Sequence, residues 1–84
     1  MSVWRKCEVT KAGAREHGRV AVELRVAGTP NENWTEWFEV VQLTQQEILA
    51  VALTSIATNS YVEAQLSSIA RGSTIERLNI LRYG

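Results

Sequence analysis

The chain segment that begins at Leu43 constrains the fold most, because it combines two signals for the start of a helix. Thr44 and Glu47 have the spacing of a capping box, in which each side chain accepts a hydrogen bond from the other residue's backbone N–H. Leu43 and Ile48 have the spacing of a hydrophobic staple, which packs the residue before the cap onto the first turn. Together these signals predict a helix that starts at Gln45.

The predicted helix is apolar nearly all round, so we expect it to be mostly buried. Apolar residues recur at helical spacing through Ile56, and alanines widen the stripe until little polar surface is left. Asn59 suits the left-handed position that ends a helix, which gives about 13 helical residues. A strand is predicted directly afterwards, because Val62, Ala64 and Leu66 alternate with polar residues.

Four further segments show the period-two alternation or the residue types of strands. They are Val3 to Thr10, Arg19 to Ala27, Trp34 to Val41 and Thr74 to Tyr83. Polar segments that contain glycine separate them and are predicted to form loops or turns. These are Lys11 to Gly18, Gly28 to Asn33 and Ala70 to Ser73. Ile75 is out of step with Leu78, which predicts a bulge or a change of face near Glu76 and Arg77.

The resulting order β-β-β-α-β-β places one helix between the third and fourth strands. This is the element order of the OB-fold, a small five-stranded Greek-key barrel. We therefore predict a mainly β fold with one helix (α+β): a single OB-like domain over residues 1–84, with the helix closing the bottom of the barrel. The order leaves open a second architecture, in which five antiparallel strands form a sheet and the helix packs across one face.

One part of the chain also resembles a recurrent pattern in small OB-like barrel proteins. The segments "ILAVALTSIATNSYVEAQLSS" and "STIERLNIL" are similar to an apolar helix, a short polar turn, an alternating strand and a final strand of the form I-x-x-I-x-L. The B subunits of AB5 bacterial toxins share this architecture. The resemblance covers about 40 residues, from Thr44 to Leu81. It implies the fold and a tendency to form rings, and it assigns no binding residue.

Composition narrows the classes of function. Nine Lys and Arg residues balance nine acidic residues, all of them Glu, so the basic excess typical of nucleic-acid modules is missing. Cys7 is the only cysteine, which excludes an intrachain disulfide. The start of the chain lacks the apolar stretch of a signal peptide, and no apolar run is long enough to span a membrane. We therefore expect a cytoplasmic protein without a membrane partner.

Few side chains could support catalysis. His17 is the only histidine and follows Glu16 in a predicted polar loop, where a solvated surface residue is the expected interpretation and a general base the alternative. Cys7 shares the apolar face of its strand with Val9, so we expect a core residue and not a nucleophile. One histidine, one cysteine and no aspartate do not make a standard zinc site. We predict that the protein is not an enzyme and uses no metal or cofactor.

The aromatic residues carry the functional interpretation. Trp34 and Phe38 are assigned to the core. Outward-facing aromatic side chains favour a subunit interface, where Trp, Tyr and Arg are enriched. They also fit a platform on which single-stranded nucleic acid stacks. The residues proposed for such a platform are Trp4, Lys6, Arg25 and Trp37.

We therefore predict a non-enzymatic binding or assembly module that forms a homo-oligomer. The residues expected to seal the interface are Trp4, Trp37, Val41, Leu81 and Tyr83. Another protein is a second candidate partner. Single-stranded nucleic acid is the less favoured alternative, and a third is carbohydrate, with an exposed Trp stacking on a sugar face as in the toxin B subunits.

Overall fold

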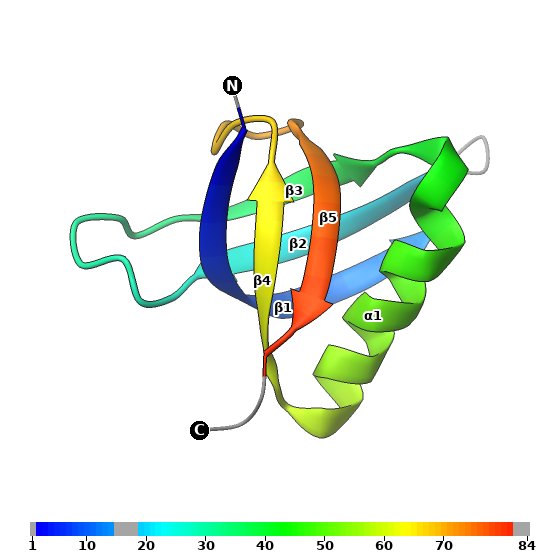
Figure 1. Ribbon diagram of the computed structural model, residues 1–84, viewed down its shortest axis with the longest axis horizontal. Coiled ribbons are helices and arrows are strands. Elements are labelled where there is room, and N and C mark those ends of the chain that lie inside the picture. Colours follow the sequence, from blue (N-terminus) through cyan, green and yellow to red (C-terminus); the bar gives the residue numbers. More distant parts are fainter. Residues whose placement is uncertain (1, 15–18, 82–84) are drawn as a thin grey trace.

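The computed structural model describes residues 2–14 and 19–81 of the chain, and within these it forms five strands and one α-helix (Figure 1). The strands are β1 (Val3–Ala14), β2 (Val20–Val26), β3 (Thr35–Val40), β4 (Tyr61–Leu66) and β5 (Thr74–Ile80). The helix α1 (Gln45–Thr58) follows β3 after a single 3-10 turn, η2 (Gln42–Thr44). The predicted mainly β chain with five strands and one helix is thus confirmed, and η2 is an element that the predicted order lacked.

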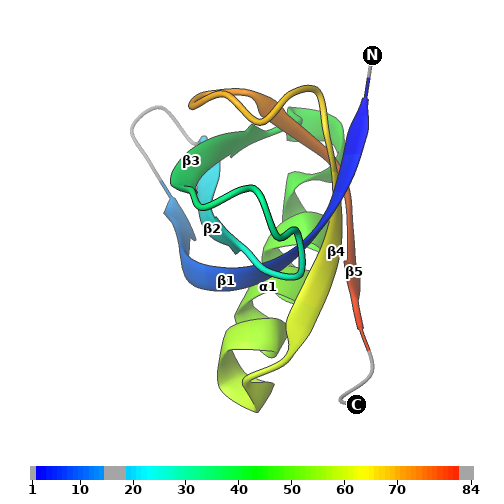
Figure 2. The same ribbon diagram turned by 90° about the vertical axis from the view of Figure 1, so that its left-hand side faces the viewer.

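The strands close into a ring in the spatial order β1-β2-β3-β5-β4, which differs from their order in the chain. β1 is antiparallel to both β2 and β4, so this one strand belongs to two ladders (Figures 1 and 2). β3 and β5 close the ring as a short parallel pair, with Glu39 opposite Thr74 and Val40 opposite Ile75. The open antiparallel sheet that the sequence left as an alternative is not formed.

β1 extends further than the sequence indicated. A β-bulge interrupts the alternation before its second half, so the sequence did not indicate that the strand continues. The register with β2 shifts between Val9 and Lys11, so Thr10 is the extra residue. The Thr10 hydroxyl donates to Glu23, with the carboxylate Oε1 at 2.6 Å and the backbone O at 3.2 Å. The prediction of a loop from Lys11 was therefore wrong for Lys11–Ala14, which continue the ladder; the rest of that loop lies outside the described residues.

The core fills the inside of the ring. Alternating strand residues point inward and are fully or almost fully buried, and α1 contributes Ile48 and Ala52 from one side. Cys7 and Phe38 belong to this cluster, as predicted, and Trp34 packs against it while half-buried. The buried strand side chains are those of Cys7, Val9, Val20, Val22, Leu24, Phe38, Val40, Val62, Ala64, Leu66, Ile75 and Leu78.

The helix begins at Gln45 and ends before Asn59, as predicted, but the two interactions expected at its start are not formed. Thr44 makes no side-chain cap hydrogen bond, because η2 leads into the helix and gives Thr44 φ −115° and ψ 11° in place of the extended backbone that a cap requires. Leu43 is 87% exposed, so the predicted staple with Ile48 is wrong. Asn59 has φ 56°, in the left-handed region expected for it.

The expectation of a mostly buried helix is also wrong. Only Ile48, Ala52 and Ser55 of α1 are buried, while Leu53 and Ile56 are 49% and 42% exposed. The helix lies along one side of the ring and packs mainly against β1 and β5 (Figure 1). An apolar composition did not imply burial here, because a single layer of strands covers one face of a helix and leaves the other to solvent.

The last hairpin contains the predicted bulge. Leu66 lies opposite Ile75 and Gln65 lies opposite Arg77, so Glu76 is the extra residue in β5. This insertion lets both Ile75 and Leu78 face the core even though three positions separate them.

Candidate binding surfaces

The predicted site residues lie on two ladders of the ring and at the ends of two strands. Trp4 and Lys6 lie on the β1–β4 ladder, opposite Gln65 and Glu63. Arg25 and Trp37 lie on the β2–β3 ladder. Trp37 is directly opposite Glu23, and Arg25 is directly opposite Thr35. Val41 directly follows β3, and Leu81 follows β5. Tyr83, like His17, lies outside the described residues. Of the four residues proposed as a nucleic-acid platform, Trp4 and Lys6 therefore lie on one ladder, and Arg25 and Trp37 lie on another.

The outward side chains of β1, β4 and β5 form the first surface, which we call the aromatic face. The pairing register lines them up in cross-strand rows, because directly opposite residues point to the same side of a sheet. Trp4 is 42% exposed and Tyr61 is 41% exposed on this face. Leu81 joins its edge, since its backbone N–H donates to the carbonyl of Tyr61 at 2.8 Å. The rows are Trp4–Gln65–Arg77, Lys6–Glu63–Asn79 and Glu8–Tyr61.

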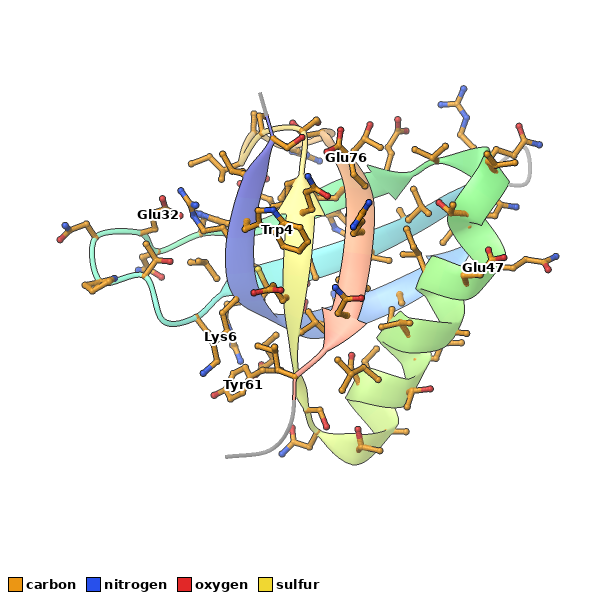
Figure 3. The ribbon with its side chains drawn as sticks, viewed as in Figure 1. Trp4, Lys6, Glu32, Glu47, Tyr61 and Glu76 are labelled. Atoms are coloured by element: carbon orange, nitrogen blue, oxygen red, sulfur yellow. The ribbon has the colours of Figure 1, made fainter. Side chains whose placement is uncertain are left out.

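Lys6 is held against an aromatic ring of this face. Its Nζ lies 4.6 Å from the centroid of the Tyr61 ring, within the range of a cation–π interaction. Figure 3 shows Lys6 beside Tyr61 near the lower end of β4, with Trp4 in front of the same strand further up. The aromatic face therefore presents two large rings with a cation between them.

Arg25, the other cation proposed for a nucleic-acid platform, has an acidic partner. Its Nη2 forms an ion pair with Glu8 Oε1, directly across the β1–β2 ladder. The pair is exposed to solvent, so its contribution to stability is small. It nevertheless places a carboxylate beside the guanidinium, which weakens attraction for a phosphate.

Arg5, Glu32 and Trp34 form a cluster near the N-terminal end of β1, on the inward-facing side of this strand. Arg5 donates from Nε and Nη2 to the two carboxylate oxygens of Glu32, at 2.9 and 2.7 Å. The Trp34 indole N–H donates to the same carboxylate at 2.9 Å, and the Trp34 ring meets Phe38 edge to face at 5.6 Å. The hydrogen bonds from Arg5 and then Trp34 lower the pKa of Glu32 to about 2.

This cluster explains the one charged residue that interrupted the apolar face of β1 in the sequence. Arg5 points inward like its neighbours Val3 and Cys7, and it is half-buried because the loop between β2 and β3 brings Glu32 over it. Figure 3 shows Glu32 at the root of that loop, beside β1. The sequence carried a signal for Arg5, its parity within the strand, but none for its partner 27 positions away.

The second surface consists of two hollows beside β3 that share Glu39, and together we call them the β3 groove. The first measures about 380 Å³ and is lined by Trp37, Phe38, Glu39, Arg71 and Gly72. The second measures about 480 Å³ and is lined by Arg19, Val20, Glu39, Val40, Val41, Gln42, Gln45 and Thr74.

The loop between β4 and β5 forms one wall of the β3 groove and is fixed to its floor. The N–H of Gly72 donates to the carbonyl of Trp37, and the N–H of Glu39 donates to the carbonyl of Ser73, both at 2.9 Å. Gly72 adopts φ +83°, a conformation that glycine reaches without strain. These bonds place Arg71 beside Trp37, although 34 positions separate them in the chain.

The described residues offer little for covalent or metal chemistry. Cys7 is fully buried, and burial raises the pKa of its thiol to about 12, so it is protonated at neutral pH. No group of three or more His, Cys, Asp or Glu side chains that could hold a metal ion occurs in residues 2–14 and 19–81. Within the same part of the chain, no helix is long and apolar enough to cross a membrane.

No protein-family model, curated protein or solved structure matches the chain. The class of protein is therefore defined by the fold and surfaces alone. Its described residues form a small, mainly β fold, with five strands in a ring, one flanking helix, an aromatic face and the β3 groove.

Proposed function

We propose that the protein is a non-enzymatic assembly module with an OB-like barrel, which associates with a second copy of itself through the aromatic face. The ring order, with a helix between β3 and β4 and a short parallel closure, supports the OB-like assignment. The observation that carries the functional proposal is the exposure of Trp4 and Tyr61 on the same sheet face, with the row of Lys6 between them.

The residue types of this face favour a protein partner over solvent. Large aromatic side chains are enriched at protein–protein interfaces and are frequent among the residues that dominate binding energy. Trp4 and Tyr61 contribute such anchors, and Lys6 lies between them. The stable strand ladders beneath keep their backbone positions fixed, so little order has to be gained on association.

The charges of the aromatic face favour a second copy as that partner. Lys6 and Arg77 provide positive charge, while Glu8 and Glu63 provide negative charge on the same surface. A two-fold interface brings each patch against its own copy, so a surface with both signs can be complementary to itself. A surface of one sign would repel its copy.

The size of the molecule is compatible with such a dimer. A stable interface buries about 800 Å² on each partner, and the whole chain exposes 5519 Å². About one seventh of the surface is therefore required, which one sheet face and its edges can supply. Association would also offset the modest core of an 84-residue domain.

The nucleic-acid alternative receives less support. Arg25 is paired with Glu8, Lys6 lies against Tyr61, and Trp37 is on a different ladder from Trp4. Phosphate binding needs cations that are free to replace counterions along a track. In the proposed platform, both cations already have a partner.

The test is the solution mass by light scattering coupled to size exclusion, for the wild type, Trp4→Ala and Leu43→Ala. We expect a wild type of about twice the monomer mass or a larger multiple at micromolar concentration. Trp4→Ala should shift the protein toward monomer, because the anchor side chain is lost. Leu43→Ala is the matched control, since Leu43 is even more exposed but lies outside the aromatic face.

Two results would refute self-association through this face. One is a monomeric wild type at every concentration up to about 100 μM, a range that reveals even weak dimers. The other is an oligomer that Trp4→Ala leaves intact and Leu43→Ala dissociates. Circular dichroism of each variant confirms that the fold is kept before the masses are compared.

A further inference from the structure

We propose that the helix carries a second self-contact, in which the outer side of α1 packs against the same side of another copy, with the two helices antiparallel. The side chains at the centre of this outer side are all exposed, and we call them the α1 face. They are Gln46, Ala50, Leu53 and Ala57. The α1 face is separate from the aromatic face, because α1 packs into the core while the aromatic side chains point outward from their sheet (Figures 1 and 2).

The outer side of α1 lacks the charges that normally solvate the exposed side of a helix. The sequence contains no charged residue from Ile48 to Asn59, and Glu47 is the only one in α1. Leu53 and Ile56 are nevertheless 49% and 42% exposed. A helix that is apolar on all sides is normally buried on all sides, and here the ring covers only one. The other side therefore has the composition of a surface that a partner covers.

The spacing of the α1 face is that of a contact between two helices. Its residues follow one another at intervals of four, three and four positions, which keeps them on one line along the helix. With 3.6 residues per turn, this line lies opposite the buried side formed by Ile48, Ala52 and Ser55. A line of this spacing lets each side chain insert between side chains of a facing helix.

An antiparallel pair of α1 faces matches large side chains to small ones. When two copies run in opposite directions about a two-fold axis, Leu53 of each copy lies opposite Ala50 of the other. Gln46 of each copy then lies opposite Ala57 of the other, at the two ends of the contact. Each leucine is thus received by an alanine, so the helix axes can approach to the usual separation of about 8–10 Å.

The residues beside the α1 face favour the antiparallel direction. Leu49 and Ile56 lie along one flank, and Glu47 and Thr54 lie along the other, because positions seven apart are nearly two full turns apart. A two-fold antiparallel pair brings each flank against the same flank of the copy, so apolar side chains meet apolar ones. A parallel pair would bring the apolar flank against the polar one. It would also place both helix N-termini side by side, where their positive dipole ends repel.

A second copy is the occupant that these features fit. The α1 face has no charge with which to recognise a charged partner, and its match of size and polarity is with itself. The contact is small, since the 14 residues of α1 span about 21 Å and a stable interface needs about 800 Å² on each partner. We therefore expect it to join two dimers, each formed through the aromatic face, into a four-chain assembly. This order of assembly rests on the proposed function, whereas the helix contact itself does not.

Sedimentation velocity of the full chain measures the assembly. We expect the wild type to form a four-chain species at about 100 μM and to dissociate into dimers at about 1 μM, as weak contacts do. Leu53→Glu should halve the mass at the higher concentration, because it places two carboxylates in an apolar contact. Thr58→Glu is the matched control, since it adds the same charge to an exposed position of α1 outside the α1 face. Circular dichroism confirms that each variant keeps the helix.

Disulfide cross-linking tests the direction of the helices without reference to the aromatic face. Gln46→Cys and Ala57→Cys proteins, one of them carrying a tag that changes its mass, are mixed in equal amounts and equilibrated in a glutathione buffer. A disulfide needs Cα atoms about 4.4–6.8 Å apart, so an antiparallel pair should link position 46 of one copy to position 57 of the other. The mixed product should therefore exceed both self-linked products. Cys7 is fully buried and should not compete.

The outcomes separate this contact from the one through the aromatic face. An assembly that Leu53→Glu reduces and Thr58→Glu leaves intact, together with an excess of the mixed disulfide, supports the α1 face. An oligomer whose mass Leu53→Glu leaves unchanged overturns the helix contact, as does an excess of self-linked products. A dimer that Leu53→Glu dissociates and Trp4→Ala leaves intact supports the helix contact and overturns the proposed function. A monomeric wild type without mixed disulfide overturns both, and binding to phosphatidylcholine vesicles that Leu53→Glu abolishes would then assign the α1 face to a lipid surface.

Discussion

At the scale of single residues, the contact between Arg5 and Glu32 fixes a loop to the ring. The loop between β2 and β3 follows Gly28, whose φ of +81° starts the turn, and returns to the sheet beside Trp34. Glu32 accepts three hydrogen bonds from Arg5 and Trp34, all at 2.7–2.9 Å. Charge-assisted, two-pronged contacts of this kind are stronger than neutral ones. They hold this end of β1 at a point where β2 no longer pairs with it.

This contact makes stability depend on pH in a defined window. The pKa of Glu32 is held at about 2 in the folded protein, below the usual value of about 4.3. The stabilisation is therefore complete above about pH 4.3 and is lost as the pH falls through 2. Glu32→Gln should be less stable than the wild type at pH 7, and the difference should shrink between pH 4.3 and pH 2.

Urea unfolding at pH 7, 5, 3 and 2, followed by tryptophan fluorescence, measures that difference. Glu47→Gln is the control, because Glu47 is exposed on α1 and has no ion pair among the described residues. A difference between Glu32→Gln and the wild type that stays constant over the whole pH range would contradict the role of the carboxylate.

At the scale of elements, the sequence pattern at the start of α1 predicted the correct first residue of the helix, although the residues of that pattern do not cap it. η2 joins β3 to α1 without a break, so Thr44 already has a turn-like backbone and Leu43 points into solvent. The helix is held by Ile48 and Ala52, which pack into the core. Tertiary packing therefore replaces the local stabilisation that the sequence indicated.

Substitutions at this junction should separate packing from capping. Leu43→Ala and Thr44→Ala should each change the free energy of unfolding by less than about 0.5 kcal/mol, as expected for surface positions. Ile48→Ala should cost about 2–5 kcal/mol, because it leaves a cavity in the core. Urea unfolding at neutral pH measures all three. A cost above about 1 kcal/mol for Leu43→Ala would mean that the staple forms in solution.

The sequence predicted those parts of the fold that depend on local pattern. Alternation located β2 and β4, and Asn59 located the end of α1 because a left-handed residue is needed there. The bulge at Glu76 was recognisable because two inward residues, Ile75 and Leu78, were out of step. The bulge at Thr10 was not, since Ala12 and Gly13 beyond it carry no strong preference for a strand.

The candidate sites were predicted only in part, for a different physical reason. Parity within a strand tells which residues face outward, and it placed Trp4 and Trp37 correctly on the outer surface. Which outward residues meet depends on how the ring closes. The β3 groove joins Trp37 to Arg71, and no short-range pattern in the chain indicates that contact.

At the scale of the whole molecule, the ring has one weak joint. β3 and β5 share only the pairs Glu39–Thr74 and Val40–Ile75, whereas β1 and β4 pair without interruption from Val3 to Glu8. Local opening requires the least energy where the fewest hydrogen bonds must break. The parallel joint between β3 and β5 is therefore where the ring should open first.

Native-state hydrogen exchange tests this order. The amide of Glu39, which bonds to Ser73 across the joint, should exchange at least about tenfold faster than the best protected amides of β4. An equal protection of the two sets would mean that the ring opens only when the whole protein unfolds. The comparison needs no variant, because both sets belong to the same molecule.

The arrangement of β1, β4 and β5 has a mechanical consequence. β4 lies between β1 and β5 and is antiparallel to both, so Val3 and Leu81 lie at opposite ends of this three-stranded sheet. A pull applied at these two points is directed along the strands. The hydrogen bonds that join the three strands then carry the load together, and the strands must slide past each other before any of them separates. Tension along this line must therefore break many of these hydrogen bonds at the same time, whereas a pull across the strands would break them one at a time.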